Sequence, residues 1–368
     1  MIAFHSNSRQ HAALAPEFER ALRGFDLADD DAAARAMAAF ETSLASYAGV
    51  GHAVGVASGT DAVTIALNCF SLPPGGEVIT CDFGFYATAA AIVRAGFQPV
   101  FVDTAPDSYL MDPARVAEAI TPQTVAIVAV HLFGEALPLT PLADLAREHG
   151  IALIEDCAQA LGARDGDRPV GTVGAASAVS FNWTKHLGSQ SNAGAVLTND
   201  AQLAEMALAL RSYGSTGGFR HDWLGLNSRI NPFEALILDV KLPHLDGWID
   251  RRAALAARYD RNFDGSPVGV PFSHAPGRHA HHKYTIRVAD RDGLHAHLLE
   301  RGVTTMACYP YLLHEHGAFD HHPHRAEPAP NAAALTGSVL ALPVFPELTD
   351  DEIDGISELI LGYVKEHS

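Results

Sequence analysis

Cysteine is scarce in this sequence, and the few cysteines are scattered. The 368 residues include only Cys69, Cys81, Cys157 and Cys308. No two of them have the C-x-x-C spacing that zinc sites and thiol redox centres use. The pattern argues against a disulfide framework, and it is typical of reduced thiols in a cytoplasmic protein.

Long hydrophobic runs are also missing. No apolar run reaches the roughly 18 residues that a membrane-spanning helix needs. The first residues, from Met1 to His5, lack the basic region and apolar stretch that mark a secretory signal. We therefore expect no membrane segment and a cytoplasmic location.

Basic residues are few in comparison with acidic ones. The chain has 25 Lys and Arg against 43 Asp and Glu, which gives a formal net charge of −18. Such an acidic chain is a poor candidate for binding nucleic acid or an anionic membrane. If it binds a phosphorylated ligand, nearby amides and single arginines must hold the anion, because distant charges are screened. A G-x-G-x-x-G after the first expected strand and a Walker sequence are both absent, which argues against a common nucleotide-binding module.

Between residues 52 and 200, short apolar segments alternate with helical ones. The apolar segments predict strands over residues 52–57, 77–80, 98–102, 125–130, 151–154, 178–181 and 194–197. Helices are expected over residues 60–69, 87–95 and 142–149. This alternation indicates an α/β fold with a mostly parallel central sheet covered by helices on both faces. Ligands of such sheets bind beyond the carboxyl ends of the strands.

The sequence changes character after residue 200. Long helices are expected over residues 201–212 and 232–262, and a connector rich in Pro, Gly and His over 265–278. A smaller α+β region then begins near residue 284 and ends in a helix over 350–366, while residues 16–47 also have helix-compatible spacing. The chain is long for a single core. We therefore predict a large α/β domain over residues 1–245 and a small C-terminal α+β domain over residues 246–368.

The segment Ser58-Gly59-Thr60-Asp61-Ala62 lies between an expected strand and an expected helix. A turn of small residues at a helix N-terminus presents free backbone amides and the positive end of the helix dipole, which favours phosphate. Ser-Gly-Thr is also an ordinary helix cap. The segment alone leaves both interpretations open.

Two further segments place chemical groups at strand ends. Glu155-Asp156 ends the strand over residues 151–154, and a pyridoxal-phosphate (PLP) enzyme needs a carboxylate against the pyridinium nitrogen. A helix cap or a metal ligand is the alternative role for Asp156. Lys185 follows the strand over 178–181 and is the only lysine between residues 1 and 240. A buried lysine loses its proton readily and can form a Schiff base, and a solvated surface lysine is the alternative.

The sequence around these residues resembles the DegT/StrS-type sugar aminotransferases, which are fold-type-I PLP enzymes. The clearest matches are Ile-Glu-Asp-Cys-Ala-Gln-Ala-Leu-Gly-Ala at residues 154–163 and Ser-Phe-Asn-Trp-Thr-Lys-His-Leu-Gly at residues 180–188. Further segments match in the same order, at residues 58–62, 77–80, 95–103, 119–122, 130–134, 225–229 and 341–343. The resemblance covers nearly the whole chain and implies a fold-type-I architecture with PLP as cofactor.

The resemblance also implies roles around the cofactor ring. Lys185 would form the Schiff base and then move the proton between the substrate carbon and the cofactor carbon. Asp156 would pair with the ring nitrogen, and Gln159 would lie near the phenolic oxygen. Phe85 matches the aromatic position that stacks on the ring face. A purely structural role inside the protein is the alternative for both Phe85 and Gln159.

Other residues would hold the phosphate by the same resemblance. These are Gly59, Thr60 and Ser180. Asn227 matches a residue that the family supplies to the phosphate from the partner subunit, which implies a homodimer with shared active sites. Arg229 is a candidate contact for the carboxylate of the amino donor or for a substrate phosphate. Capping and bracing the helix after residue 232 is the alternative role for Asn227 and Arg229.

The implied reaction has two halves. An amino-acid donor, L-glutamate by resemblance, leaves its amino group on the cofactor and departs as the keto acid. A keto-sugar linked to a nucleotide then takes the amino group, so the catalysis is covalent and ping-pong. The wording Asn227-Ser228-Arg229 resembles family members that act at the 3-position of the sugar more than those that act at the 4-position.

The chain departs from the family pattern at several positions. Asn192 and Ala193 stand where the family usually has an acid and a glycine, and Cys308 precedes Tyr309-Pro310 where a histidine is common. His314 matches a family histidine. We take Asn192, Tyr309 and His314, together with Arg229, as candidate substrate contacts.

Two other functions stay open at this point. One is an aminotransferase for a free cyclic ketone such as an inosose, and the other is a PLP-binding regulatory protein without turnover. The histidine-rich stretch formed by His314, His316, His321, His322 and His324 is compatible with a divalent metal, although a solvated loop is the more ordinary interpretation. We expect no bound metal.

Overall fold

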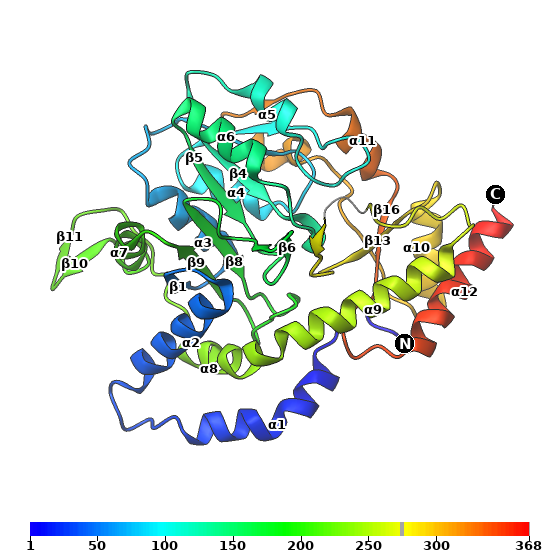
Figure 1. Cartoon of the computed structure of the whole chain (residues 1–368), viewed down its shortest axis with the longest axis horizontal. Coiled ribbons are helices and arrows are strands. Elements are labelled where there is room, and N and C mark those ends of the chain that lie inside the picture. The colour runs from blue at the N-terminus through cyan, green and yellow to red at the C-terminus, as the bar shows by residue number, and fades with distance from the viewer. Residues whose placement is uncertain (273–275, 368) are drawn as a thin grey trace.

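A computed structural model describes residues 1–272 and 276–367. Its centre is an eight-stranded sheet in the order β1-β9-β8-β5-β4-β2-β3-β15 (Figure 1). The strands are β1 (His52–Val56), β2 (Glu77–Cys81), β3 (Gln98–Val102), β4 (Thr124–Val130), β5 (Ala152–Asp156), β8 (Ala176–Ser180), β9 (Gly194–Thr198) and β15 (Arg325–Ala326). Pairing is parallel from β8 to β15, and β9 is antiparallel to both of its neighbours. The predicted mostly parallel α/β fold is confirmed.

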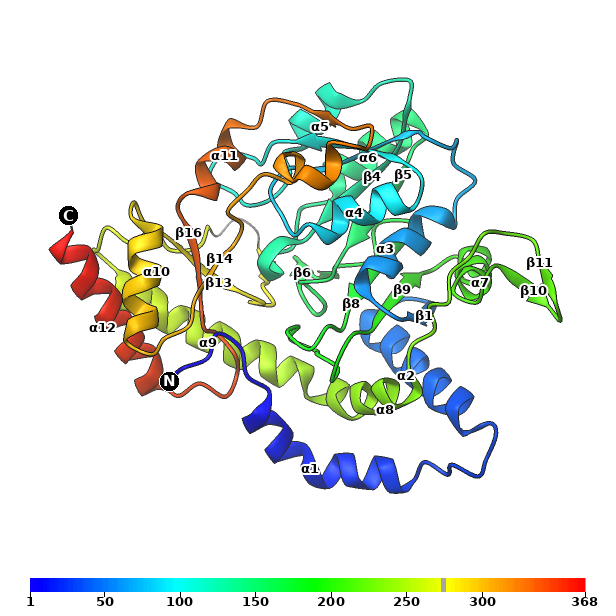
Figure 2. The ribbon, with the colours of Figure 1, turned by 180° about the vertical axis from the view of Figure 1, so that it is seen from behind.

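Helices cover both faces of this sheet. One face carries α3 (Gly59–Asn68), α4 (Ala87–Arg94) and α7 (Ala201–Leu210), which Figure 2 shows in front of or beside the strands. The other face carries α2 (Ala32–Ala48), α5 (Pro113–Ala119), α6 (Thr140–His149) and α8 (Pro232–Lys241). Adjacent residues of β4 alternate between the two cores, with Val128 on the α3 face and Ile127 on the α5 face. Burial on both faces explains why the strands are continuously apolar.

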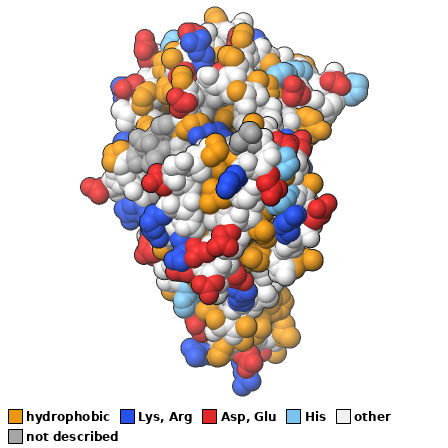
Figure 3. Space-filling model, turned by 90° about the vertical axis from the view of Figure 1, so that its right-hand side faces the viewer, with side chains coloured by type: hydrophobic (Ala, Val, Ile, Leu, Met, Phe, Trp, Pro, Cys, Tyr) orange, Lys and Arg blue, Asp and Glu red, His pale blue; other side chains and the backbone are white. Residues whose placement is uncertain are grey.

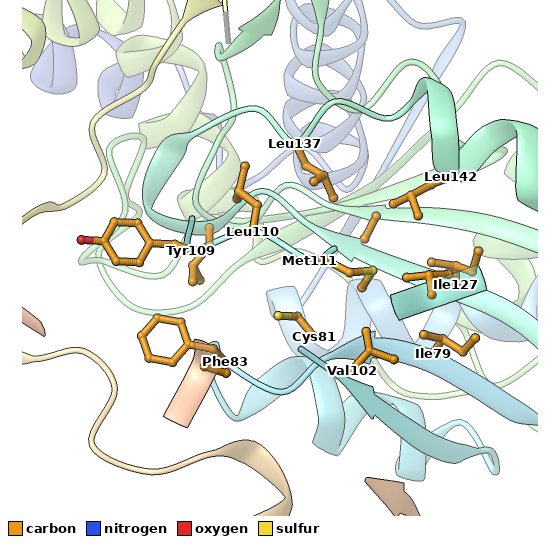
Figure 4. Packing of buried hydrophobic residues seen from close by; sticks show 14 of the residues in the cluster. Ile79, Cys81, Phe83, Val102, Tyr109, Leu110, Met111, Ile127, Leu137 and Leu142 are labelled. Carbon is orange, nitrogen blue, oxygen red and sulfur yellow. The ribbon is translucent and has the colours of Figure 1, made fainter. Parts of the chain in front are cut away.

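Figure 4 shows the core on the α5 face from close by. Ile79 and Ile127 from neighbouring strands lie beside each other, and Leu142 of α6 closes over them. Phe83 and Tyr109 stack with their ring centroids 6.3 Å apart where the strands end. The apolar layer therefore reaches up to the strand ends, where we expected the ligand site.

The C-terminal part of the chain builds a second core. It contains a three-stranded sheet in the order β13-β16-β14, formed by β13 (Tyr284–Arg287), β16 (Val339–Leu342) and β14 (Met306–Ala307). The helices α9 (Leu245–Phe263), α10 (Arg291–Glu300) and α12 (Asp350–Glu366) pack against it. Figure 3 shows that acidic and basic side chains are interspersed on the outer face of this part. One such pair joins α9 to α12, with Arg258 Nη2 2.5 Å from Asp354 Oδ2.

The two parts exchange segments. β15 lies beyond residue 300 in the sequence, yet it pairs with β3 at the edge of the large sheet. At the other end of the chain, Ile2 forms a parallel bridge with Val303. Smaller elements complete the structure: β6 (Arg164–Asp165), β7 (Arg168–Pro169), β10 (Ser215–Gly217), β11 (Arg220–His221), β12 (Gly277–Arg278) and α11 (Pro330–Thr336), and four 3-10 turns at Leu132–Gly134, Leu242–His244, Leu313–Glu315 and Gly317–Phe319.

Two predicted helical stretches are interrupted in the structure. The first, over residues 16–47, is divided into α1 (Ser8–Arg23) and α2, because Asp26 and Asp29 each accept a backbone N–H two residues later and form turns in the linker. The second, over residues 232–262, is broken by the 3-10 turn at Leu242–His244, which contains a proline that cannot continue an α-helix. Residues 273–275 of the predicted connector lie outside the described residues.

No helix in the described parts of the chain combines the length and the apolar character that crossing a membrane requires.

Candidate active site

A cavity of about 640 Å³ lies between the ends of strands β5 and β8 of the large sheet and the three-stranded C-terminal sheet. Most of the residues predicted for the site line it, namely Gly59, Thr60, Phe85, Asp156, Gln159, Ser180, Lys185, Asn192 and Tyr309. Asn227, Arg229 and His314 do not line it. The turns after β1, β5 and β8 supply the wall on the side of the large sheet, as expected for an α/β fold.

The N-terminus of α3 forms one end of the cavity. Ser58 caps this helix by accepting the N–H of Asp61 at 3.1 Å, and the first N–H groups of the helix, at Gly59 and Thr60, need no partner within the helix. A Cβ atom on Gly59 would lie only 2.5 Å from Cβ of Ser180. Glycine therefore lets the helix end approach Ser180, and the resulting cradle of amides and hydroxyl fits a phosphate group.

Asp156 lies at the end of β5, and its side chain is almost completely buried at 5% exposure. Its Oδ2 accepts a hydrogen bond from Thr88 Oγ1 at 2.7 Å, and its Oδ1 accepts the N–H of Ala158 at 3.0 Å. Both donors fix the orientation of the carboxylate. An oriented carboxylate that lines the cavity fits the role of partner to a protonated ring nitrogen.

Lys185 lies five residues after the end of β8, in a tight turn. Its N–H donates to the carbonyl of Asn182 at 2.8 Å, and the Asn182 side chain accepts from Thr184 Oγ1 at 2.7 Å. Burial lowers the pKa of the Lys185 amine to about 8, the charge of Lys283 adds to the lowering, and Asp156 opposes it. An amine with this pKa is partly unprotonated near neutral pH and can act as a nucleophile and as a base.

Glu155 precedes Asp156 but has a different environment. It points to the opposite face of the sheet, is fully buried, and accepts N–H groups of Gly171, Val173 and Gly174 at 2.5, 2.8 and 2.7 Å. His131 Nε2 donates to it at 3.0 Å. Burial raises the pKa of Glu155, but the hydrogen bonds outweigh burial and hold the pKa below its usual value. This acid is a structural anchor for the loop before β8.

The same hydrogen bonds explain a cluster of three side chains that resembles a metal site. Among the described residues, one set of three potential metal ligands has all its ligand atoms within 4.8 Å of one another. The set consists of His131, Glu155 and Cys157. His131 Nδ1 accepts the N–H of Leu137 at 2.9 Å, so Nε2 carries the proton that it donates to Glu155. Both ring nitrogens are therefore occupied, and the group needs no metal. The ligand atoms of the histidine-rich segment do not converge in this way.

Gln159 and Tyr309 connect the two parts of the chain. Gln159 Oε1 accepts the N–H of Phe133 at 3.0 Å, and Gln159 Nε2 donates to Tyr309 Oη at 3.1 Å. The Tyr309 ring lies 6.1 Å from the ring of Phe85, whose side chain is 53% exposed at the mouth of the cavity. Phe85 is thus available to a flat ligand, and Gln159 is not a free amide but part of the wall.

Asn192, which stands in place of the family acid, has a structural partner. Its Oδ1 accepts a hydrogen bond from Asn182 Nδ2 at 2.8 Å. Asn182 in turn positions the turn that carries Lys185. The amide therefore orders the lysine loop without adding a negative charge to the cavity.

The three remaining predicted residues lie outside the cavity. Asn227 and Arg229 are exposed, and Arg229 Nε donates to Ser212 Oγ at 2.9 Å. Ser228 between them is buried and donates to Asp61 Oδ2 at 2.7 Å, which ties this loop to the first turn of α3. His314 is paired with Asp82, with Nδ1 2.6 Å from Oδ2.

Several residues of the cavity were not identified from the sequence. Thr88 holds Asp156, and Arg252, His282 and Lys283 line the wall on the C-terminal side. The lysine count alone offered a signal for Lys283, because lysine is rare throughout this chain. No local pattern distinguishes the other three, since their roles depend on contacts between distant segments.

The N-terminal segment closes the cavity from the side. Ala3, Phe4 and His5 line it. His5 Nε2 and Asn7 Nδ2 both donate to the carbonyl of Trp183, at 3.1 and 2.8 Å, two residues before Lys185. We call residues 1–7 the N-terminal strap, since they connect the C-terminal sheet to the lysine loop.

Comparison with known proteins agrees with this geometry. Residues 28–361 match the sequence pattern of the DegT/DnrJ/EryC1/StrS aminotransferase family. The chain belongs to this family. The resemblance inferred from the motifs is thereby confirmed over most of the chain.

Several proteins with known names resemble the chain over most of its length. A "pleiotropic regulatory protein" of Geobacillus stearothermophilus is 39% identical over 97% of each chain. A UDP-N-acetyl-3-dehydro-alpha-D-glucosamine 3-aminotransferase of Acidithiobacillus ferrooxidans is 39% identical over 88% of this chain and 87% of its own. The crystal structure of S. venezuelae DesV superposes with a TM-score of 0.92 and 34% identity, over 99% of this chain and 98% of that one.

Membership defines the cofactor and the reaction type. The protein is a PLP-dependent aminotransferase. The residues in the cavity fit this cofactor, because a helix N-terminus, an oriented carboxylate and a lysine of lowered pKa surround the same space. When bound, PLP supplies an electron sink for the carbon that exchanges its amino group.

Proposed function

We propose that this chain transfers an amino group from L-glutamate to a keto-deoxysugar linked to a nucleotide, with the keto group at the 3-position. One observation carries the proposal: Lys185, Asp156 and the N-terminus of α3 line a single cavity in a chain that resembles nucleotide-sugar aminotransferases throughout its length. The 3-position is supported by the A. ferrooxidans relative, whose name specifies a 3-aminotransferase.

Each proposed residue has one task. The amides of Gly59 and Thr60, with the Ser180 hydroxyl, bind the phosphate group of the cofactor. Asp156, held by Thr88, keeps the ring nitrogen protonated, and Phe85 covers the ring at the cavity mouth. Gln159, held by Phe133 and Tyr309, would form the part of the wall beside the ring oxygen.

Lys185 moves the proton at the reacting carbon. Its amine has a pKa of about 8, because burial lowers the pKa and Lys283 adds to the effect. A group with a pKa near the working pH accepts a proton and returns it with similar ease, which is the requirement for a general acid–base catalyst. The same side chain therefore serves both halves of the reaction.

We also propose a homodimer in which Asn227 and Arg229 act on the partner's cavity. Both side chains are exposed and lie away from the cavity of their own chain. The adjacent β10–β11 hairpin projects from the body of the molecule (Figure 1). Phe219 in its turn and Leu224 just after it are almost completely exposed, at 103% and 99%. Large apolar side chains on a projecting element indicate a protein contact, and we propose a second copy of this chain as the partner.

The dimer proposal has a direct test. Sedimentation of the wild-type protein should give a dimer, and the double substitution Phe219→Ser with Leu224→Ser should shift it toward the monomer. Mixing Lys185→Ala chains with Asn227→Ala chains should restore part of the activity that each variant lacks, because mixed dimers would contain one complete site. A monomeric wild-type protein with full activity contradicts the proposal.

The function itself is tested with the purified protein and PLP. Addition of L-glutamate should abolish the visible absorbance of the lysine-bound cofactor, and a 3-keto nucleotide sugar should then restore it. A 4-keto nucleotide sugar and a free inosose are the comparison substrates. Turnover of the 4-keto compound alone would overturn the 3-position.

A second candidate function is a PLP-binding regulator without turnover, which the name of the G. stearothermophilus relative favours. The spectral test separates the two functions. A regulator would bind PLP at Lys185 and show the visible band, but L-glutamate would leave the band unchanged.

We further propose that the smaller domain begins near residue 246 and that the protein is located in the cytoplasm. The start of α9 at Leu245 and the separate core around α9 and α12 support the boundary. The four cysteines are unpaired, which supports a reducing compartment. Expression of residues 246–368 alone, and fractionation of cells that express the full chain, test these proposals.

A further inference from the structure

The charge of the cavity differs from the charge of the whole chain. The chain has a net charge of −18, yet Asp156 is the one carboxylate among the described residues that line the cavity. Lys185, Arg252 and Lys283 line the same space, whereas burial lowers the pKa of His5 and of His282 and keeps these two rings neutral. Nearby charges dominate the field in a partly buried site. The cavity therefore favours anionic ligands despite the acidic surface.

Lys283 directly precedes β13 and lines the cavity on its C-terminal side. Its Nζ lies 3.8 Å from Met306 Sδ and 4.9 Å from the centre of the Phe4 ring. A thioether is a weak acceptor, and the face of a phenyl ring is a modest partner for a cation. Among the described residues, no carboxylate forms an ion pair with Lys283. A half-buried ammonium with such partners gains from an anion that a ligand brings.

Arg252 of α9 supports this wall from behind. The buried guanidinium donates through Nη1 to the carbonyls of His281 and Val344, at 3.2 and 3.1 Å. Its Nε has no hydrogen-bond partner within the described residues. Burial lowers the pKa of Arg252 to about 10, and the charge of Glu347 opposes this effect. Arg252 therefore stays charged and keeps one donor unused.

The position of Lys283 relative to Lys185 indicates which anion fits. Both amines line the cavity, and the charge of Lys283 acts on Lys185 by lowering its pKa. In an α-amino acid, the carboxylate is attached to the carbon that carries the amine. In a nucleotide-linked sugar with a 3-keto group, the sugar ring separates the phosphates from the reacting carbon. The anion that must lie close to Lys185 is the carboxylate of the amino acid.

We propose that Lys283, with Arg252 behind it, forms the subsite for the carboxylate of the amino-acid donor. Phe4 of the N-terminal strap and Met306 of β14 hold the ammonium from the sides without neutralising it. The subsite is separate from the cradle formed by Gly59, Thr60 and Ser180. This inference rests on the proposed function, because it assumes an amino acid as the donor.

The test compares Lys283→Met with Lys365→Met, both prepared as holoenzymes. Lys365 is exposed in the last turn of α12 and serves as the matched control. Calorimetry with glutarate, a dicarboxylate without an amine, measures the subsite without turnover. We expect Lys283→Met to weaken glutarate binding by roughly tenfold to a hundredfold, the usual effect of losing a charge-assisted hydrogen bond. Lys365→Met should change nothing, Lys283→Arg should restore most of the affinity, and the affinity for PLP should stay the same in all variants.

The half-reaction with amines distinguishes this role from others. Lys283→Met should raise the L-glutamate concentration for half-saturation, and this effect should be much larger than any change in the reaction with ethylamine, which lacks a carboxylate. An equal loss with ethylamine would mean that Lys283 only tunes Lys185, and it would overturn the proposal. Unchanged glutarate binding in Lys283→Met would also overturn the proposal. The same holds if Lys283→Met loses affinity only for a nucleotide-linked uronate or only for a nucleotide sugar with a neutral ring.

The carboxylate subsite and the proposed function can fail separately. If wild-type protein binds glutarate in a manner that depends on Lys283, but L-glutamate never changes the visible absorbance, the proposed donor is wrong and the carboxylate subsite stands. If L-glutamate reacts and Lys283→Met reacts with the same half-saturation, the proposed function stands and the subsite is wrong.

Discussion

The two walls of the cavity differ in how completely their polar groups are satisfied. On the side of the large sheet, Asp156 accepts two hydrogen bonds from the protein, and the loop of Lys185 is fixed by Asn182 and Thr184. On the C-terminal side, Lys283 lacks an anionic partner and Arg252 has an unused donor within the described residues. A preorganised wall suits a resident cofactor, whereas a wall with unpaired cations suits ligands that enter and leave.

The largest effect that tests this comparison is expected from Lys185→Ala. The rate of the half-reaction with L-glutamate should fall by about 10⁴-fold, because the variant lacks both the nucleophile and the acid–base group. Stopped-flow absorbance under single-turnover conditions measures it. Lys365→Ala is the control, and a variant that keeps a tenth of the wild-type rate would disprove the role of Lys185.

Asp156→Asn should reduce the same rate by about 10²- to 10³-fold, because it removes one preorganised charge at the ring. Its neighbour provides the matched substitution. Glu155→Gln should leave the chemistry nearly intact but lower the thermal midpoint, since a buried carboxylate that accepts four hydrogen bonds loses its charge. The expected loss is about 2–3 kcal/mol of unfolding free energy. Equal catalytic losses in the two variants would contradict the assignment.

Gly59→Ala should weaken the binding of PLP by roughly tenfold, because the added Cβ would lie 2.5 Å from Cβ of Ser180 and would open the phosphate cradle. Fluorescence titration of the apoprotein with PLP measures the affinity. Gly247→Ala in α9 is the control, since nothing lies within 4 Å of its added Cβ. An unchanged affinity for PLP in Gly59→Ala would contradict the assignment of the phosphate cradle.

The smallest effect concerns the pH dependence of stability. The pKa of Lys185 falls from its ordinary value of 10.5 to about 8 in the folded protein, mainly through burial. Between these values Lys185 binds more protons in the unfolded chain than in the folded one, so the contribution of Lys185 to the stability of the apoprotein should rise as the pH increases from 8 to 10.5. Denaturant unfolding at several pH values should therefore give a more positive slope of stability against pH for the wild-type protein than for Lys185→Met, because Lys241 and the buried thiols contribute equally to both. The same slope in both proteins would show that other groups are responsible.

The sequence predicted most of the sheet and the wall that belongs to it. The strand over residues 98–102 was predicted to the residue, and Asp156 and Lys185 were placed at strand ends because apolar runs locate those ends well. Gly59 and Ser180 were assigned together from the family resemblance, and the structure brings them into contact.

The other wall was largely missed, for a physical reason. Arg252 and Lys283 come from segments with no local motif, and they line the cavity only because distant parts of the chain pack together. Thr88 lies in an expected helix, but its pairing with Asp156 connects residues 68 positions apart. Periodicity reports which face of an element is buried and does not report which distant side chain it meets.

The N-terminal strap links the order of synthesis to the completion of the cavity. Ile2 pairs with Val303, and His5 and Asn7 hold the Trp183 carbonyl. During translation residues 1–7 emerge long before Val303, so Ile2 cannot form its bridge until most of the chain has been made. The cavity therefore acquires its full set of walls only after residue 303 has been made, although Ala3, Phe4 and His5 are among the earliest residues of the wall to emerge.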